Sequence, residues 1–177
     1  SNAFSSSSSL CATRKPLPDR IRWVKVSGLS WYKDGFFYSR YPAPADTTKK
    51  LSGSNENHRV YYHLIGTPQE QDQLVFEDPA HPKRFHTVSV TDDERYLILS
   101  VDDRSVAGND GHALYVRDLS KGETGFRPVV TTFKDTYDVL DNVGDKLLVS
   151  NNQGAPKWRV VEIDPARPEP ANWGEIL

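Results

Sequence analysis

Short stretches in which polar and apolar residues alternate recur along this chain, in the same order, three times. The clearest copies lie at residues 60–64, 113–117 and 158–162, and polar turns follow them at 66–69, 118–122 and 164–167. Alternation over a few residues is typical of a β-strand with one buried face, and clusters of Gly, Pro, Asn and Asp mark turns. The pattern predicts an all-β chain made from copies of one unit.

Each copy carries further strand-like stretches, so the repeat is about 40–50 residues long. Such a repeat is typical of β-propeller blades, of which about 4–8 close into a ring. We predict blades at about residues 28–77, 85–132 and 136–177, which together form a unit over 19–177. The chain is therefore predicted to be a partial β-propeller of about three four-stranded antiparallel blades, part of a ring rather than a finished one.

Individual strands follow from the same pattern. Residues 20–26 alternate and predict a half-buried strand ahead of the first blade. The pair Asp34-Gly35 predicts a hairpin turn, because this dipeptide accepts positive φ angles. Residues 95–101 form the most apolar run and predict a strand buried on both faces, near the middle of a blade. No stretch has a convincing helical period.

Composition narrows the class of protein. With 37% hydrophobic and 11% aromatic residues, the chain is suited to a globular β protein rather than to disorder. A net charge of -2 provides no broad basic surface for nucleic acid or an anionic membrane. No apolar run approaches the ~20 residues of a membrane span. Cys11 is the only cysteine, which excludes an intramolecular disulfide.

Residues 1–18 are predicted to be a flexible segment outside the blades. Residues 1–3 look like the remnant of a cleaved tag, and 5–9 are a serine tract. Residues 10–12, Leu-Cys-Ala, faintly resemble a lipoprotein cleavage site, but no apolar segment precedes them. The compartment stays open, and a cytoplasmic location is slightly favoured over a periplasmic one.

Residues with reactive or metal-binding side chains form no familiar motif. A serine hydrolase needs a Gly-x-Ser-x-Gly turn, and residues 52–55 only approach it, so we interpret them as a flexible loop. His81, His86 and His112 lack zinc spacing and are predicted to lie in turns or at the surface. His63 lies in an alternating strand and is predicted to be packed and hydrogen-bonded.

Four oxygen-bearing side chains near residue 105 raise the question of calcium. They are Asp102, Asp103, Asn109 and Asp110. Their spacing does not match the EF-hand loop, and Gly108–Gly111 has the chemistry of a turn. We interpret the stretch as a solvated loop at a blade edge, and we predict neither a metal nor a cofactor.

Several long motifs resemble a single family, in order from about residue 12 to residue 177. They lie at residues 23–31, 34–42, 61–68, 92–100 and 151–165. Together they resemble the propeller of prolyl oligopeptidases. The resemblance implies a serine peptidase in which a seven-bladed propeller covers an α/β-hydrolase domain and admits short peptides for cleavage after proline. It implies that the partners of this chain are that domain and a peptide substrate.

The resemblance also implies substrate contacts, although the catalytic triad would lie in the hydrolase domain. The family's propeller lends a phenylalanine from a Phe-Tyr strand, which Phe37 matches, and an arginine after a Leu-Ser strand. Asp102 occupies that second place and Arg104 follows two residues later. An aspartate cannot donate hydrogen bonds to a peptide carbonyl as a guanidinium does, which puts prolyl specificity in doubt. Phe37 is equally compatible with a place in the blade core.

Two other interpretations stay open beside the peptidase. Open blades expose strand edges that can pair with another chain, so the protein could serve as a binding or scaffold module. It could also be a degenerate fragment that folds because blades are nearly independent repeat units. For the chain alone we expect no peptide hydrolysis, and we expect self-association.

Overall fold

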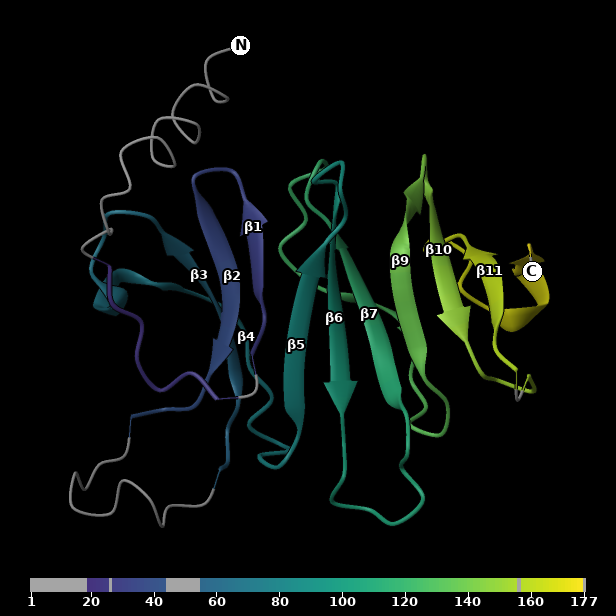
Figure 1. The fold of residues 1–177 in the computed structure, drawn as a ribbon, viewed down its shortest axis with the longest axis horizontal. Helices are drawn as coiled ribbons and strands as arrows, with labels where there is room; N and C mark the ends of the chain where they lie inside the picture. The colour runs from purple at the N-terminus through teal and green to yellow at the C-terminus, as the bar shows by residue number, and fades with distance from the viewer. Residues whose placement is uncertain (1–18, 26, 44–54, 156, 177) are drawn as a thin grey trace.

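The computed structural model describes residues 19–25, 27–43, 55–155 and 157–176. They form three four-stranded antiparallel sheets, in each of which the strands lie side by side in chain order (Figure 1). The first sheet consists of β1 (Leu29–Tyr32), β2 (Gly35–Arg40), β3 (Arg59–Leu64) and β4 (Gln73–Phe76). The second consists of β5 (Phe85–Val90), β6 (Tyr96–Asp102), β7 (His112–Asp118) and β8 (Arg127–Val130). The third consists of β9 (Tyr137–Val143), β10 (Lys146–Asn151), β11 (Arg159–Ile163) and β12 (Gly174–Glu175).

The described residues contain no α-helix, only the short 3-10 turns η2 (Gln69–Gln71) and η3 (Pro170–Asn172). The three sheets confirm the prediction of an all-β chain with three four-stranded blades. The predicted features within 1–18 and at 52–54, including Cys11 and the serine tract, lie outside the described residues.

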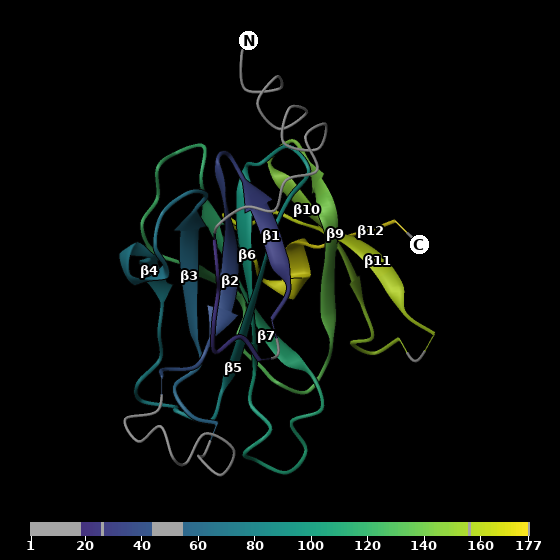
Figure 2. The same ribbon diagram turned by 60° about the vertical axis from the view of Figure 1, so that its left-hand side comes forward.

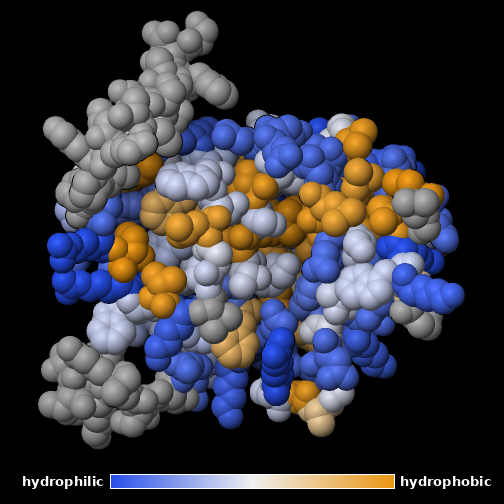
Figure 3. Space-filling model, viewed as in Figure 1, coloured by the Kyte–Doolittle hydropathy of each residue, from blue (hydrophilic) through white to orange (hydrophobic). Residues whose placement is uncertain are grey.

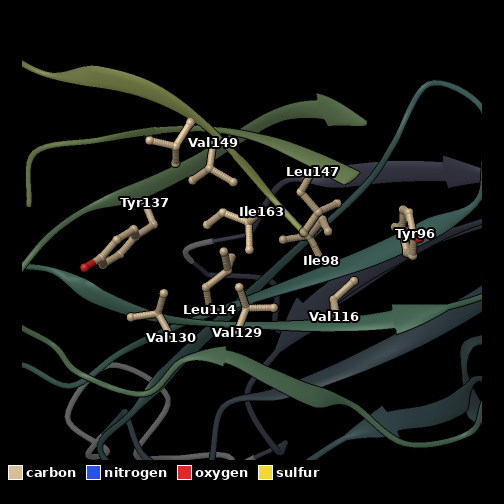
Figure 4. Close-up of a cluster of buried hydrophobic side chains, with 11 residues drawn as sticks. Tyr96, Ile98, Leu114, Val116, Val129, Val130, Tyr137, Leu147, Val149 and Ile163 are labelled. Atoms are coloured by element: carbon tan, nitrogen blue, oxygen red, sulfur yellow. The ribbon is translucent and has the colours of Figure 1, made fainter. Parts of the chain in front are cut away.

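The second sheet lies between the other two and packs against both (Figures 1 and 2). Strand β6 supplies both interfaces, because Leu99 and Val101 face the first sheet while Tyr96 and Ile98 face the third. Figure 4 shows the second interface, where Ile98 and Leu114 approach Leu147 and Ile163. Each such side chain contributes about 1.5–3 kcal/mol when fully buried. This confirms the prediction of a strand buried on both faces.

The predicted strand at residues 20–26 is wrong. Residues 19–25, which we call the strap, pair with no strand and instead run along the face of the first sheet that points away from the second. Trp23 has a φ of 63°, which is incompatible with an extended strand. Groups from the connections between the strands bond the strap's backbone instead: the Gln69 side chain bonds Arg22, the His58 ring bonds the Lys25 carbonyl, and the Tyr41 N–H donates to the Trp23 carbonyl. Alternation here therefore reflects packing on a sheet without pairing.

The first hairpin forms where it was predicted, but neither Asp34 nor Gly35 has the positive φ angle that the prediction assumed. The positive φ falls on Lys33, at 51°, and not on Gly35. Gly35 is required for another reason, because a Cβ at this position would lie 2.2 Å from the His63 carbonyl oxygen across the sheet. The last strand of the third sheet, β12, covers only two residues.

Candidate functional site

Phe37 is a packed residue in the middle of β2. Its side chain is 4% exposed, lies 5.7 Å from the Tyr32 ring and 5.0 Å from the Tyr62 ring, centre to centre, and faces the second sheet. The Tyr62 hydroxyl donates to the Tyr32 carbonyl oxygen at 3.0 Å and fixes this aromatic group. Phe37 lines a hollow of about 360 Å³, with Lys33 and Arg117 among the other lining residues.

Arg104 lies in the loop that joins β6 to β7. Its side chain is 78% exposed, and its guanidinium is 3.9 Å from the nearer Asp102 oxygen, which is a loose ion pair. It lines a separate hollow of about 430 Å³ with residues 106–110. The two residues predicted to contact substrate therefore line different hollows, and their roles stay predictions.

A partly buried ion-pair network anchors the loop that carries Arg104. Asp103 is 6% exposed and accepts hydrogen bonds from Arg84 Nε at 2.9 Å and from the Ser105 hydroxyl at 2.5 Å. Arg84 also donates to Asp78 at 3.1 Å and lies over the Phe133 ring. The Ser105 and Arg84 bonds lower the pKa of Asp103. Because Asp103 is held inward, its neighbour Arg104 extends into solvent.

The oxygen-rich loop forms no cation cage within the described residues. Asp103 is committed to Arg84 and Ser105, and no group of three His, Cys, Asp or Glu side chains in the described ranges comes close enough to hold a metal ion. Likewise, no helix in this part of the chain is long and apolar enough to cross a membrane.

The prediction that His86 lies in a turn or at the surface is wrong. His86 lies in β5 and is 1% exposed, and its ring stacks on the equally buried His58 at the interface between the first two sheets. The His86 backbone N–H donates to His58 Nδ1 at 2.9 Å, and His86 Nδ1 donates to the His58 carbonyl at 2.8 Å. Burial lowers the pKa of His86, and burial together with the His86 ring lowers that of His58 to about 4.

The other histidines vary in burial. His81 is half exposed in a turn beside Asp78, as predicted, whereas His112 is half-buried and bonds to the Tyr137 carbonyl at 2.8 Å. His63 confirms its prediction, because its ring is fully buried and lies between two carboxylates, Asp72 at 2.6 Å and Asp19 at 3.1 Å.

Three β-propeller-type blades and the loops between their strands define the class of this protein. The family model for the prolyl oligopeptidase N-terminal beta-propeller domain matches residues 10–177. The chain therefore belongs to the prolyl oligopeptidase family, and it corresponds to part of the N-terminal propeller.

Similar proteins agree with this assignment. A prolyl endopeptidase of Elizabethkingia miricola is 37% identical over 93% of this chain, and prolyl oligopeptidase A of Amanita bisporigera is 35% identical over 86%. The solved apo structure of prolyl oligopeptidase B from Galerina marginata is 28% identical, with a TM-score of 0.75 over 96% of this chain. The chain spans only 21–23% of the length of these relatives.

Proposed function

We propose that this chain is part of the substrate-gating propeller of a prolyl oligopeptidase-like serine peptidase that cleaves short peptides after proline. The match of the family model over residues 10–177 carries the proposal. The partners are a peptide substrate and an α/β-hydrolase domain, which supplies the catalytic triad. The blades give the hydrolase domain a rigid cover, and the loops between strands carry the groups that meet substrate.

Arg104 and Phe37 have different parts in this proposal. The exposed guanidinium of Arg104 is free to donate to a peptide carbonyl, and the Arg84–Asp103 pair holds the start of its loop. Phe37 supports the aromatic wall of its own hollow. Arg104 is therefore the better candidate for direct contact, and Phe37 acts through packing.

A chimera tests the proposal. We would replace the matching stretch of the Elizabethkingia miricola enzyme with this chain and measure hydrolysis of a short chromogenic peptide that contains proline. We expect the chimera to be active and the isolated chain inactive. In the chimera, R104A should raise KM, whereas R167A, which removes a similarly exposed arginine from the turn after β11, should not. A folded but inactive chimera would count against the proposal, and so would turnover by the isolated chain that survives repurification.

A second candidate function, a binding module, is favoured by the exposed apolar residues of the edge strands. Leu29 and Trp31 of β1 are each 59% exposed, and Leu140 and Val143 of β9 are 59% and 62% exposed. Figure 3, which has the same view as Figure 1, shows apolar residues in a band across the face of the molecule. Such a surface favours association with another chain. We expect light scattering across a concentration series to show discrete oligomers, and a monomer at every concentration would exclude self-association.

A further inference from the structure

The hollow of about 360 Å³ that Phe37 lines is enclosed by two blades that both belong to this chain. All four strands of the first sheet contribute to one wall, and the end of β7 with the turn to β8 forms the opposite wall. The hollow lies at the end of the sheets where β2 begins. The Arg104 loop follows the end of β6, which runs in the same direction as β2 (Figure 1). The hollow is therefore at the opposite end of the blades from Arg104.

Tyrosine and phenylalanine side chains form a fixed aromatic wall on the first sheet. Phe37 and Tyr62 are cross-strand partners, so their rings share the face that points toward the second sheet. The Tyr62 ring extends over Gly35, where a Cβ would lie 2.6 Å from the tyrosine oxygen, and its hydroxyl donates to the Tyr32 carbonyl oxygen at 3.0 Å. The wall is therefore preformed and offers a flat apolar surface to a ligand.

Arg117 is a cation in a row of residues that otherwise packs the second sheet on the first. It follows Ala113 and Tyr115 at alternate positions of β7, so its side chain points toward the first sheet as theirs do. An apolar residue would serve this packing, because partial burial of a charge costs free energy. The Arg117 Nε donates to the Glu123 carbonyl oxygen and fixes the plane of the guanidinium. Its two terminal nitrogens have no hydrogen bond to any residue that the structure describes, so they are available to a ligand.

Lys33 adds a second positive charge at the rim of the hollow. Its side chain is exposed, and its Nζ lies 4.8 Å from the centre of the Tyr32 ring. Glu123, the carboxylate among the described residues that line the hollow, is paired with Arg127 at 3.3 Å. Neither Lys33 nor Arg117 has a carboxylate within ion-pairing distance in the described part of the chain. The hollow therefore has an excess of positive charge beside an aromatic wall.

We propose that this hollow binds a small aromatic carboxylate, whose ring lies on the aromatic wall and whose oxygens accept hydrogen bonds from Arg117 while Lys33 adds an ion pair. A guanidinium fork matches the two oxygens of a carboxylate, and aromatic rings favour one another at centroid distances of about 4.5–7 Å. The volume is near the lower end of the ~300–1,000 Å³ of ligand pockets, which suits a single aromatic residue and not a nucleotide.

Such a group is presented by the C-terminal residue of a peptide and by a free aryl acid. The site goes beyond the proposed function, because it lies away from Arg104 and needs no hydrolase domain. Its test therefore uses this chain alone and reads binding rather than hydrolysis.

Titration of the whole chain, followed by two-dimensional NMR of its backbone amides, tests the site with three probes. N-acetyl-phenylalanine has the ring and the carboxylate of a peptide C-terminus, phenylacetate represents a free aryl acid, and N-acetyl-phenylalaninamide lacks the charge. We expect saturable shifts at the β1–β2 and β7–β8 turns, with a dissociation constant of about 1 mM for a ligand of this size. The amide should bind about tenfold more weakly, because it loses charge-assisted hydrogen bonds.

The two acids distinguish the sources of the ligand. Equal affinities support the site with a free aryl acid as a sufficient ligand, and a preference for N-acetyl-phenylalanine supports it with a peptide C-terminus. The proposal is overturned if neither acid binds, if the amide binds as tightly as the acids, or if the shifts lie only in other parts of the chain.

Matched variants identify the groups responsible. R117M removes the guanidinium but keeps an apolar stem in the row, and it should weaken the binding of N-acetyl-phenylalanine about tenfold. K121M removes an exposed lysine of the same turn that does not line the hollow, and it should leave the affinity unchanged. If Arg117 only holds the Glu123 carbonyl, R117M should lose stability without losing affinity, and that result would overturn the proposal.

A second variant decides if R117M does not fold. Lys33 is exposed, so K33M should fold and should weaken binding about threefold, as expected for the loss of an exposed ion pair. The same affinity in K33M, K121M and the unaltered chain would show that positive charge at the rim does not attract the ligand, which would overturn the proposal.

Discussion

Two histidine sites in and beside the first sheet differ in charge although both are fully buried. His63 lies between the carboxylates of Asp72 and Asp19 and is charged, whereas His58 lies against the backbone N–H of His86 and is neutral. Burial disfavours the charged form at both sites. The difference shows that the hydrogen-bonding partners, rather than the degree of burial, decide whether a buried histidine is charged.

The two sites also differ in what they join. The His63 site connects residues of one sheet and the strap, with Asp72 following η2 directly. The His58–His86 pair instead joins the first sheet to the second. The Ser39 hydroxyl, which donates to the His86 carbonyl at 2.7 Å, adds a second hydrogen bond across the same interface. Loss of the first site should therefore destabilise the first blade itself, and loss of the second should weaken the packing between the first two blades.

Removal of Asp72 should have the largest effect. D72A leaves the charged ring of His63 buried with one carboxylate fewer and leaves the Tyr38 hydroxyl without its acceptor. Removal of one partner from a buried ion pair costs about 3–5 kcal/mol, so urea unfolding at pH 7 should show a loss of this size. E70A, which removes an exposed carboxylate from the neighbouring η2, should cost less than about 0.5 kcal/mol. Equal losses in the two variants would contradict a charged His63.

Acid should weaken the second site by an intermediate amount. His58 has a pKa of about 4 in the folded chain and about 6.5 in the unfolded chain, so the unfolded chain takes up the proton first as pH falls. Lowering the pH from 7 to 5 should therefore reduce the free energy of unfolding by about 2 kcal/mol through this residue. The asparagine in H58N can still accept the His86 N–H but does not titrate, so this variant should lose that part of the pH dependence. Urea unfolding of both proteins at the two pH values measures the difference, and identical slopes would show that His58 does not titrate as inferred.

The sequence predicted what depends on local pattern. Residues 95–101 were recognised as a strand buried on both faces because an unbroken apolar run needs apolar neighbours on two sides. His63 was recognised as a packed residue because it lies within an alternating strand. At residues 20–26 the same pattern misled, since alternation records which side chains meet a sheet and not whether the backbone pairs.

The histidine pair lay beyond sequence reasoning for a physical reason. His58 directly precedes β3 and His86 lies 28 residues later in β5, so only the packing of one blade on the next brings them together. No motif marks such a contact. The separation of Phe37 from Arg104 has the same origin, because sequence order does not say which hollow a side chain lines.

Ser39 allows the smallest and most selective test of the comparison. S39A removes one buried hydrogen bond to the His86 carbonyl and should cost about 1 kcal/mol. Because the His58–His86 pair then loosens and water gains access, the pKa of His58 should rise toward its ordinary value while the titration of His63 stays unchanged, as read from histidine NMR. S30A removes a comparable bond between the same two sheets, the one that the Val90 N–H donates at 2.8 Å, and should leave both titrations unchanged. If S39A and S30A shift His58 equally, the histidine pair responds to the general contact between the sheets and not to its own hydrogen bonds.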